Sequence, residues 1–403
     1  MGRNAPLNFT VQKVSDTHYV GRAQGLGVEV VKTLVLDQQK YSVDTQIEIV
    51  GQSDLFMGVT TYMVERLLKL ESGSILSPSF ERQEAYALGN DKSERLHIKD
   101  QNEQVSLEHL QVAALGGQYF TQAFVDRSDI LPSLKTVVNT TSESIMNMIS
   151  YSLLNRGQQM KLKYTAFMGP KDLELLRSVN EKLIGVVDFG FFALLGRPIL
   201  SALKWFDHLV GNWGVAIILL TIMVRFLVLP FNVMSFRSMK AMQVIQPHIQ
   251  DLKTRYKDDP TRMNQEMLQL FRTHKVNPIG GCLPVLLQIP VFFALYQVLG
   301  HSVELYHAPF ILWIHDLSHK DPYYVLPILM GITMFFQMKL TPTTMDPTQA
   351  KIMMFMPVIM TLFMLALPSG LTLYILVSTL FGIVQQLYLM KSSPILTPVT
   401  ANK

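Results

Sequence analysis

The stretch 213–231, WGVAIILLTIMVRFLVLPF, decides the fold of this chain. It is an apolar run close to the length that a helix needs to cross a bilayer, with a single charge, Arg225, near its middle. Because a charge at the bilayer centre costs roughly 2.5–3.5 kcal/mol on insertion scales, we expect Arg225 to lie in a hydrated cavity. Thr221 lies four residues earlier and therefore on the same helical face. The alternative is that Arg225 snorkels toward the nearer membrane interface.

The composition indicates a membrane protein whose first half resembles a soluble domain. The chain has 403 residues, of which 49% are hydrophobic and 16% charged, and nearly all the long apolar runs lie after residue 205. The net charge of +4 gives no indication of nucleic-acid binding. The single cysteine, Cys282, excludes an internal disulfide framework and a cysteine zinc cluster.

Residues 26–168 carry the signals of β-strands. Between residues 43 and 49 apolar and polar side chains alternate, which is the period of a half-buried strand. Further strands are expected at 28–36, 59–67, 105–112, 119–125, 135–139, 145–154 and 159–167. The last two flank the sequence NRGQ at 155–158, which predicts a β-hairpin. Many strands with little helix between them predict an antiparallel β-sandwich, and 171–187 is expected to close it as a helix.

The segment 189–210 is apolar but is interrupted by Gly196-Arg197-Pro198. After the proline, apolar and polar residues alternate with a helical period, which predicts an amphipathic helix lying in the membrane interface. A membrane-crossing helix is the alternative for this segment. The first 25 residues hold no apolar core of the kind that a signal peptide or an anchor helix needs.

Five membrane spans are expected at 213–231, 282–299, 323–339, 351–367 and 370–389. The polar segment 233–278 has more basic than acidic residues and is broken by Asp258-Asp259-Pro260, so it predicts a cytoplasmic hairpin of two helices. The loop 301–321 is more acidic and is expected on the opposite side. Five crossings then leave the sandwich outside the cytoplasm and the C-terminus inside.

The sequence offers no catalytic constellation. His248 and His274 have no acidic partner at ligand spacing, and the spacings of His301, His307, His315 and His319 match no zinc motif. No phosphate-binding or dinucleotide-binding glycine motif is present. The functional residues are therefore expected among the polar side chains within the spans. Gln297 and Gln337 are predicted to join helices by hydrogen bonds. A common cavity is predicted for Thr221, Arg225, Gln288 and Ser378.

Four long segments of the second half resemble one family. They are 213–231, 245–299 (beginning IQPHIQDLKTRYKDDP), 308–337 (beginning APFILWIHDLSHKDP) and 367–386 (LPSGLTLYILVSTLFGIVQQ). They closely resemble the YidC/Oxa/Alb family of membrane protein insertases, over about 197–390. The preceding sandwich, including TAFMGPKDLELL at 165–176, resembles the periplasmic domain of Gram-negative members. Compared with those members, we expect the sequence to depart in three respects: an N-terminal anchor span is not recognised in it, its sandwich is shorter, and its C-terminal segment is not strongly basic.

The resemblance implies an α+β membrane protein built from four parts. These are a periplasmic antiparallel β-sandwich with its closing helix (1–187), an interfacial helix (188–211), a five-span helical core (212–390) that includes the cytoplasmic hairpin (233–278), and a cytoplasmic tail (391–403). It also implies an intramembrane groove around Arg225, open to the cytoplasm and to lipid. Thr221, Gln288 and Ser378 are the candidates for its wall, and the candidates for a slide that a substrate helix follows are Phe292, Met330, Phe363 and Tyr374.

The implied function is the insertion and folding of membrane proteins in the bacterial inner membrane, without covalent chemistry, metal or cofactor. The implied partners are nascent membrane proteins, the lipid bilayer and the Sec translocon, with the ribosome and targeting factors as candidates at the hairpin; no nucleic-acid specificity is expected. The alternative function is a small-molecule or ion transporter, although the spans show no obvious internal repeat of the kind that many transporters carry.

Overall fold

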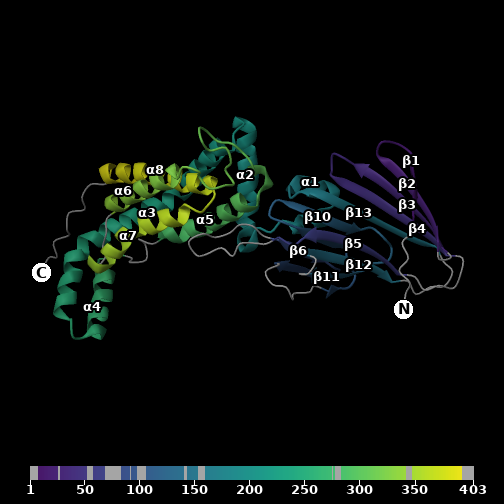
Figure 1. Ribbon diagram of the computed structural model, residues 1–403. Coiled ribbons are helices and arrows are strands. Elements are labelled where there is room, and N and C mark those ends of the chain that lie inside the picture. Colours follow the sequence, from purple (N-terminus) through teal and green to yellow (C-terminus); the bar gives the residue numbers. More distant parts are fainter. Residues whose placement is uncertain are drawn as a thin grey trace. The chain divides into compact units, whose positions relative to one another are not determined.

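The structure is a computed structural model that describes residues 8–25, 28–51, 58–68, 83–90, 92–97, 106–139, 143–152, 159–274, 276, 283–341 and 347–392. It divides into two compact units, a β unit formed mainly by residues up to Asp188 and a helical unit formed mainly by residues from Phe189 onward (Figure 1).

The β unit consists of two antiparallel sheets (Figure 1). The larger has the order β1-β2-β3-β4-β13-β10-β9-β6-β7. Its strands are β1 (Thr10–Lys13), β2 (His18–Gly25), β3 (Val28–Asp37), β4 (Ser42–Gly51), β6 (Glu84–Leu88), β7 (Ser93–His97), β9 (Val112–Gly116), β10 (Phe120–Asp126) and β13 (Met160–Pro170). The smaller has the order β5-β12-β11-β8, from β5 (Gly58–Arg66), β12 (Ser144–Ser152), β11 (Ser133–Asn139) and β8 (Ser106–Leu107).

One apolar core holds the two sheets together. Ile145 and Ile149 of the smaller sheet and Leu162 and Phe124 of the larger are almost fully buried and belong to the same cluster. Alternate residues along the strands supply this core, as the period-two pattern of the sequence requires. In β6 and β9 of the larger sheet the residues of the opposite face are buried as well. The predicted antiparallel β-sandwich is confirmed.

The predicted hairpin between β12 and β13 is wrong. β12 pairs with β5 and β11, whereas β13 pairs with β4 and β10, so these two strands belong to different sheets; the segment 153–158 that joins them lies outside the described residues. Ile145 and Ile149 of β12 and Leu162 of β13 belong to one apolar core between the two sheets, and each strand forms its backbone hydrogen bonds within its own sheet. The predicted strand 105–112 is likewise divided between β8 and β9, and β1, β2, β6 and β7 were not predicted.

A buried ion cluster lies near the end of the β unit. Lys171 Nζ is 2.6 Å from Glu84 Oε1, and Arg95 Nη1 is 2.8 Å from Glu84 Oε2. Arg95 also donates to the carbonyl oxygens of Gly185 and Val186. The cluster therefore joins the segment 171–186 to strands β6 and β7 of the larger sheet.

The predicted closing helix is present in two pieces, α1 (Leu173–Val179) and the 3₁₀ helix η1 (Glu181–Val186). Asp172 caps α1 by accepting a 2.7 Å hydrogen bond from Leu175 N. Asn180 is extended between the two pieces, and its side chain accepts from Lys182 N at 2.9 Å. Asparagine favours such capping over the helix interior, which explains the break.

The remaining elements are η2 (Gly190–Phe192), α2 (Ala193–Val210), α3 (Trp213–Arg255), α4 (Pro260–Thr273), α5 (Leu283–His301), η4 (Val303–Leu305), α6 (Val325–Leu340), α7 (Pro347–Met364) and α8 (Ser369–Ser392). α2 continues through Gly196-Arg197-Pro198, so the interruption of the apolar run does not interrupt the helix. Pro198 lies early in the helix, where its missing N–H removes one bond near the helix start and leaves the later turns intact. α2 ends at Gly211, whose φ of +67° gives a left-handed cap.

α3 is one continuous helix of 43 residues that contains the predicted first span and the first arm of the predicted hairpin. Its second half and α4 form a two-helix hairpin (Figure 1), packed through Met242, Ile245 and Ile249. α4 begins at the Asp258-Asp259-Pro260 sequence: Asp259 caps the helix by accepting from Arg262 N at 3.0 Å, and Pro260 is the first helical residue.

Two of the described helices are long and apolar enough to cross a membrane, Trp213–Arg255 and Ser369–Lys391. Three shorter apolar helical stretches, Leu286–His301, Val325–Leu340 and Met353–Met364, lie where the other spans are predicted.

Candidate functional site

Arg225 of α3 is bound to α8. Its Nε and Nη2 atoms donate to Ser378 Oγ at 2.8 and 2.5 Å. In the part of the chain that the structure describes, Arg225 forms no ion pair with a carboxylate. The guanidinium is thus held by a neutral hydroxyl and keeps its full positive charge available.

A second hydrogen bond joins the same two helices further along. Asn232 Nδ2 donates to Gln385 Oε1 at 3.4 Å. Asn232 follows Arg225 by seven residues and Gln385 follows Ser378 by seven, so both bonds join positions that are 153 residues apart. A constant offset means that α3 and α8 run parallel, with the two bonds about 10 Å apart along the axes at 1.5 Å per residue.

α6 runs parallel to α8 by the same reasoning. Thr341 Oγ1, just past the end of α6, lies 3.4 Å from Gln386 Oε1. One turn earlier, a Cβ added to Gly382 would lie 2.6 Å from Gln337 Nε2. Both pairs are 45 residues apart, so α6 and α8 are parallel. The three helices α3, α6 and α8 therefore run in the same direction, and α3 and α6 each pack against α8.

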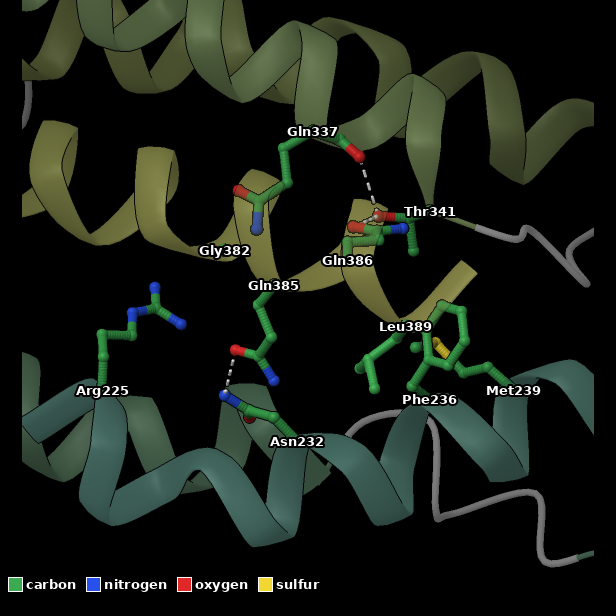
Figure 2. Close-up of a pocket in the computed structure, with 10 residues that line it drawn as sticks. All are labelled: Arg225, Asn232, Phe236, Met239, Gln337, Thr341, Gly382, Gln385, Gln386 and Leu389. Atoms are coloured by element: carbon green, nitrogen blue, oxygen red, sulfur yellow. Dashed lines mark hydrogen bonds between the residues drawn. The ribbon is translucent and has the colours of Figure 1, made fainter. Parts of the chain in front are cut away.

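These three helices line an open polar cavity of about 220 Å³ (Figure 2). Its lining residues are Arg225, Asn232, Phe236, Met239, Gln337, Thr341, Gly382, Gln385, Gln386 and Leu389. In Figure 2 the Arg225 side chain extends from α3 toward the space between the helices, with Asn232 on the same helix and Gln385 opposite it. Arg225 is the only charged residue among the ten that line the cavity, so nothing in its wall neutralises that charge.

Two buried polar atoms of the wall have no hydrogen-bond partner among the described residues, Asn232 Oδ1 and Gln386 Nε2. A buried amide atom without a partner is costly unless water satisfies it. The cavity is polar and has room for several water molecules. We therefore expect the cavity to be hydrated.

The opposite ends of the same helices are covered by the loop of residues 306–324, here called the capping loop. Asn212, the N-cap of α3, donates to Phe310 O at 3.1 Å. Gly370 N at the start of α8 donates to Leu317 O at 3.0 Å, and Leu326 N at the start of α6 donates to Asp321 Oδ2 at 2.7 Å. The three helices therefore begin together under the capping loop, and the cavity lies toward their other ends.

Tight packing separates the capping loop from the cavity. In α3 the residues Ala216, Ile217 and Leu220 are almost fully buried, and in α8 so are Leu371 and Thr372. The helical bundle is thus closely packed toward the capping loop, whereas the polar cavity lies toward its other end.

The structure brings only some of the predicted cavity residues together. Arg225 and Ser378 are bonded, but Thr221 is completely buried and donates to Ile217 O of its own helix at 2.6 Å. Gln288 donates to the hydroxyl of Tyr374, a residue predicted for the slide. Of the four predicted cavity residues only Arg225 lines the polar cavity; Thr221, Gln288 and Ser378 do not, although Ser378 holds the Arg225 side chain.

The predicted slide residues divide into two pairs. Met330 is 0% exposed and Tyr374 2% exposed, so both lie inside the helical unit, where no passing helix reaches them. Phe292 is half-buried, with its ring 5.6 Å from that of Phe293, and Phe363 is also half-buried.

Sequence reasoning missed Asn232, Thr341 and Gly382 as lining residues, and it assigned Gln337 only to helix contacts. Gln337 does approach Gly382 closely, but it also lines the cavity. The signal was present for Asn232, because a spacing of seven from Arg225 places both on one helical face. No metal site replaces this polar one: the described residues contain no group of three or more His, Cys, Asp or Glu side chains that could hold a metal ion.

Comparison with known proteins assigns the two halves of the chain in succession. Residues 15–202 match the family described as "YidC periplasmic domain", and residues 205–395 match the family described as "60Kd inner membrane protein". A crystal structure titled "Active YidC insertase crystal structure with the first transmembrane domain resolved" is 20% identical, covers 96% of this chain and 95% of that one, and has a TM-score of 0.44.

Curated relatives carry the same name. The "Membrane protein insertase YidC" of Geotalea daltonii is 46% identical over 283 residues, which are 70% of this chain and 53% of the relative. That of Magnetococcus marinus is 41% identical over 379 residues, 91% of this chain and 67% of the relative. The chain spans about half the length of the first curated relatives that it matches. From these matches over both halves, the chain belongs to the YidC family of membrane protein insertases.

Proposed function

We propose that this chain inserts membrane proteins into the bacterial inner membrane and assists their folding, by giving the polar part of a client a hydrated place inside the bilayer. The observation that carries the proposal is the Arg225 guanidinium, bound to Ser378 at the wall of a polar cavity among three parallel helices.

The parallel helices support a five-span topology. If α3, α6 and α8 are the first, third and fifth spans, they must run in the same direction, as the constant offsets of 153 and 45 residues require. The intervening spans are then α5 and α7, which are apolar and short. Short spans fit a membrane that is locally thinned around the protein.

The basic hairpin sets the orientation of this topology. Its excess of lysine and arginine favours the cytoplasm, which directs the cavity to the cytoplasmic side and the capping loop and β-sandwich to the periplasm. The outward apolar side chains of α2, including Trp205, Leu209 and Leu194, support an interfacial position for that helix.

The energetics of insertion require no cofactor or nucleotide. An apolar client helix gains about 0.3–0.6 kcal/mol per large apolar residue at its centre, whereas its flanking polar segment must cross hydrocarbon. A water-filled cavity that reaches part of the way shortens this crossing. Arg225, in a medium less polar than water, attracts an acidic segment more strongly than an exposed arginine does.

The same arrangement fits a role beside the Sec translocon as well as alone, and the hairpin is the proposed contact for ribosomes and targeting factors. Its apolar core keeps the two arms together, while basic side chains such as Arg255, Lys257 and Arg262 lie along it. The substrate slide is proposed only for Phe292 and Phe363, which are not fully buried.

Crosslinking tests the function directly. A photo-reactive amino acid placed at Gln385 or Asn232 should crosslink to a stalled nascent membrane protein in proteoliposomes, whereas one at Leu220, which is 1% exposed, should not. Equal crosslinking at all three positions, or none at Gln385 and Asn232, would contradict the proposed path. Client-independent flux of small solutes would instead favour a transporter.

A further inference from the structure

A second cavity adjoins the first at the ends of the same helices. Its volume is about 350 Å³, and its lining residues are Phe236, Lys240, Gln243, Lys339, Leu340, Thr341 and Met390. Phe236 and Thr341 line both cavities. The second cavity therefore lies beside the first, at the end of the bundle opposite the capping loop.

Positive charge dominates the second cavity. Lys240 comes from α3 and Lys339 from the last turn of α6, so lysines of two separate helices line one space. The Lys339 ammonium also lies 4.6 Å from the centre of the Phe335 ring one turn earlier. Of the described residues that line it, none is acidic. Gln243 and Thr341 add neutral polar groups. Such a set is suited to an anion that several donors share.

The apolar part of the lining points to the kind of anion. Leu340 and Met390 complete the wall beside the lysines. The neighbouring surfaces of α6 and α8 are apolar and exposed, with Phe336 at 56% and Leu387 at 43%. A ligand with a compact anionic head and apolar chains matches both surfaces at once, since the head meets the lysines and the chains follow the helices. Basic pockets between membrane helices on the cytoplasmic side bind lipid head groups in this way.

We propose that Lys240 and Lys339 hold the phosphodiester head group of an anionic glycerophospholipid at the mouth of the Arg225 cavity. The inference rests on the proposed membrane embedding of the helical unit. It goes beyond the proposed insertase function, because it assigns a resident lipid to the place where a client enters. The lipid borders the hydrated cavity, so an acidic client segment that moves toward Arg225 passes its head group.

Native mass spectrometry of the full chain, released from nanodiscs of equal parts phosphatidylglycerol and phosphatidylcholine, tests the proposal without any client. The test variant is Lys240→Gln/Lys339→Gln. The matched control is Lys257→Gln/Arg262→Gln, which removes the same charge from two exposed positions of the hairpin, away from the cavity. A lysine near a membrane surface is worth about 1 kcal/mol toward an anionic lipid, so the test variant should lower retention of phosphatidylglycerol about 30-fold. The control should change it less than about twofold.

Equal losses in both variants, or no loss in the test variant, would overturn the proposal. Two competitors identify the source of the phosphate. If inorganic phosphate displaces phosphatidylglycerol as well as the soluble head group glycerophosphoglycerol does, the site is a phosphate site and the lipid assignment fails. If the test variant keeps the lipid but loses binding of an acidic peptide, the lysines serve the client and the proposal fails. Because retention is measured without insertion, failure here leaves the proposed insertase function to its own crosslinking test.

Discussion

The guanidinium of Arg225 and the hydroxyl of Ser378 form a two-donor contact between α3 and α8, with Nε and Nη2 at 2.8 and 2.5 Å from one oxygen. An arginine has five N–H donors, so those that Ser378 does not engage remain for water or for a client. A carboxylate partner would have neutralised the charge and closed the site. A serine positions the side chain and leaves its charge available.

Replacement of Arg225 tests the electrostatic part of the mechanism. Two unit charges about 4 Å apart interact by about 4 kcal/mol at an effective dielectric of about 20. Losing a third of this in Arg225→Ala would slow insertion of a client with an acidic translocated segment about tenfold. The measurement is the initial rate of protease protection in proteoliposomes.

The controls for Arg225 separate charge from packing. Arg225→Lys keeps the charge and should retain most of the activity, whereas Arg225→Gln keeps only hydrogen bonding and should resemble the alanine variant. A client without acidic residues in its translocated segment should be affected little. If Arg225→Ala inserts both clients at the wild-type rate, attraction to the arginine has no part in insertion.

Filling the cavity tests its volume. Gly382 lies where any added side chain meets Gln337, so Gly382→Leu should occupy the cavity and impair insertion of acidic and neutral clients alike. Val384→Leu on the exposed face of the same helix is the matched control. Gly382→Ala requires only the flexible end of Gln337 to shift, and should be nearly normal. Normal insertion by a folded Gly382→Leu protein would show that the cavity is not used.

Removing the hairpin tests its role in recognition. Replacing residues 245–273 by a short glycine-serine linker retains Lys240, Gln243 and both cavities. If the hairpin receives ribosomes or targeting factors, co-translational insertion should fall while insertion of a purified, pre-made client in liposomes is unchanged. If the variant inserts clients at the wild-type rate in both assays, the hairpin only marks the topology.

Two carboxylates of the β-sandwich should respond oppositely to neutralisation. Burial raises the pKa of the Glu84 carboxyl, but the charges of Lys171 and Arg95 outweigh this effect and hold the pKa below its usual value. Glu84 therefore stabilises the fold above the unfolded pKa of about 4.3, and this stabilisation is lost as the pH falls through the lower folded value. Glu84→Gln at pH 7 leaves Lys171 buried without its partner, at a cost of about 3 kcal/mol.

Burial raises the pKa of Glu65, and its Oε2 atom has no hydrogen-bond partner among the described residues. A raised folded pKa means that stability is lost as the pH rises through the range between the unfolded and folded values. Glu65→Gln should therefore stabilise the sandwich at pH 7, with an advantage that disappears toward pH 4. Hydrogen exchange at Ala85 and Ala113, in the larger sheet, measures both variants. The same sign of change at pH 7 in both would contradict these assignments.

Sequence periodicity predicted most of this fold because burial is local to each strand and helix. The strands from β3 to β5 and from β10 to β13 were recognisable by alternation, and the hairpin break by Asp259-Pro260. Pairing was not predictable in the same way: NRGQ between two strands favours a hairpin, but the core that joins Ile145 to Leu162 places those strands in opposite sheets. Strand partners depend on such distant contacts.

For the candidate site, the sequence identified Arg225 and Ser378 because polar residues are conspicuous in an apolar run. It missed Asn232 because the apolar run of the first span stops at Phe231, whereas the helix α3 continues to Arg255. It grouped Thr221 with the cavity by helical spacing, but that hydroxyl is satisfied by its own backbone. Spacing along one helix shows which residues share a face, and only the packing of the other helices decides whether that face is wet or dry.

Aqueous labelling of single cysteines tests the hydrated cavity most directly. With Cys282, the one natural cysteine, replaced by serine, cysteines at Asn232 and Gln385 are exposed to a membrane-impermeant maleimide from the cytoplasmic face of inverted vesicles, with Thr221 as the buried reference. The account predicts rapid labelling at Asn232 and Gln385 and none at Thr221 until the protein is unfolded. Protection of all three positions in the folded protein would contradict it.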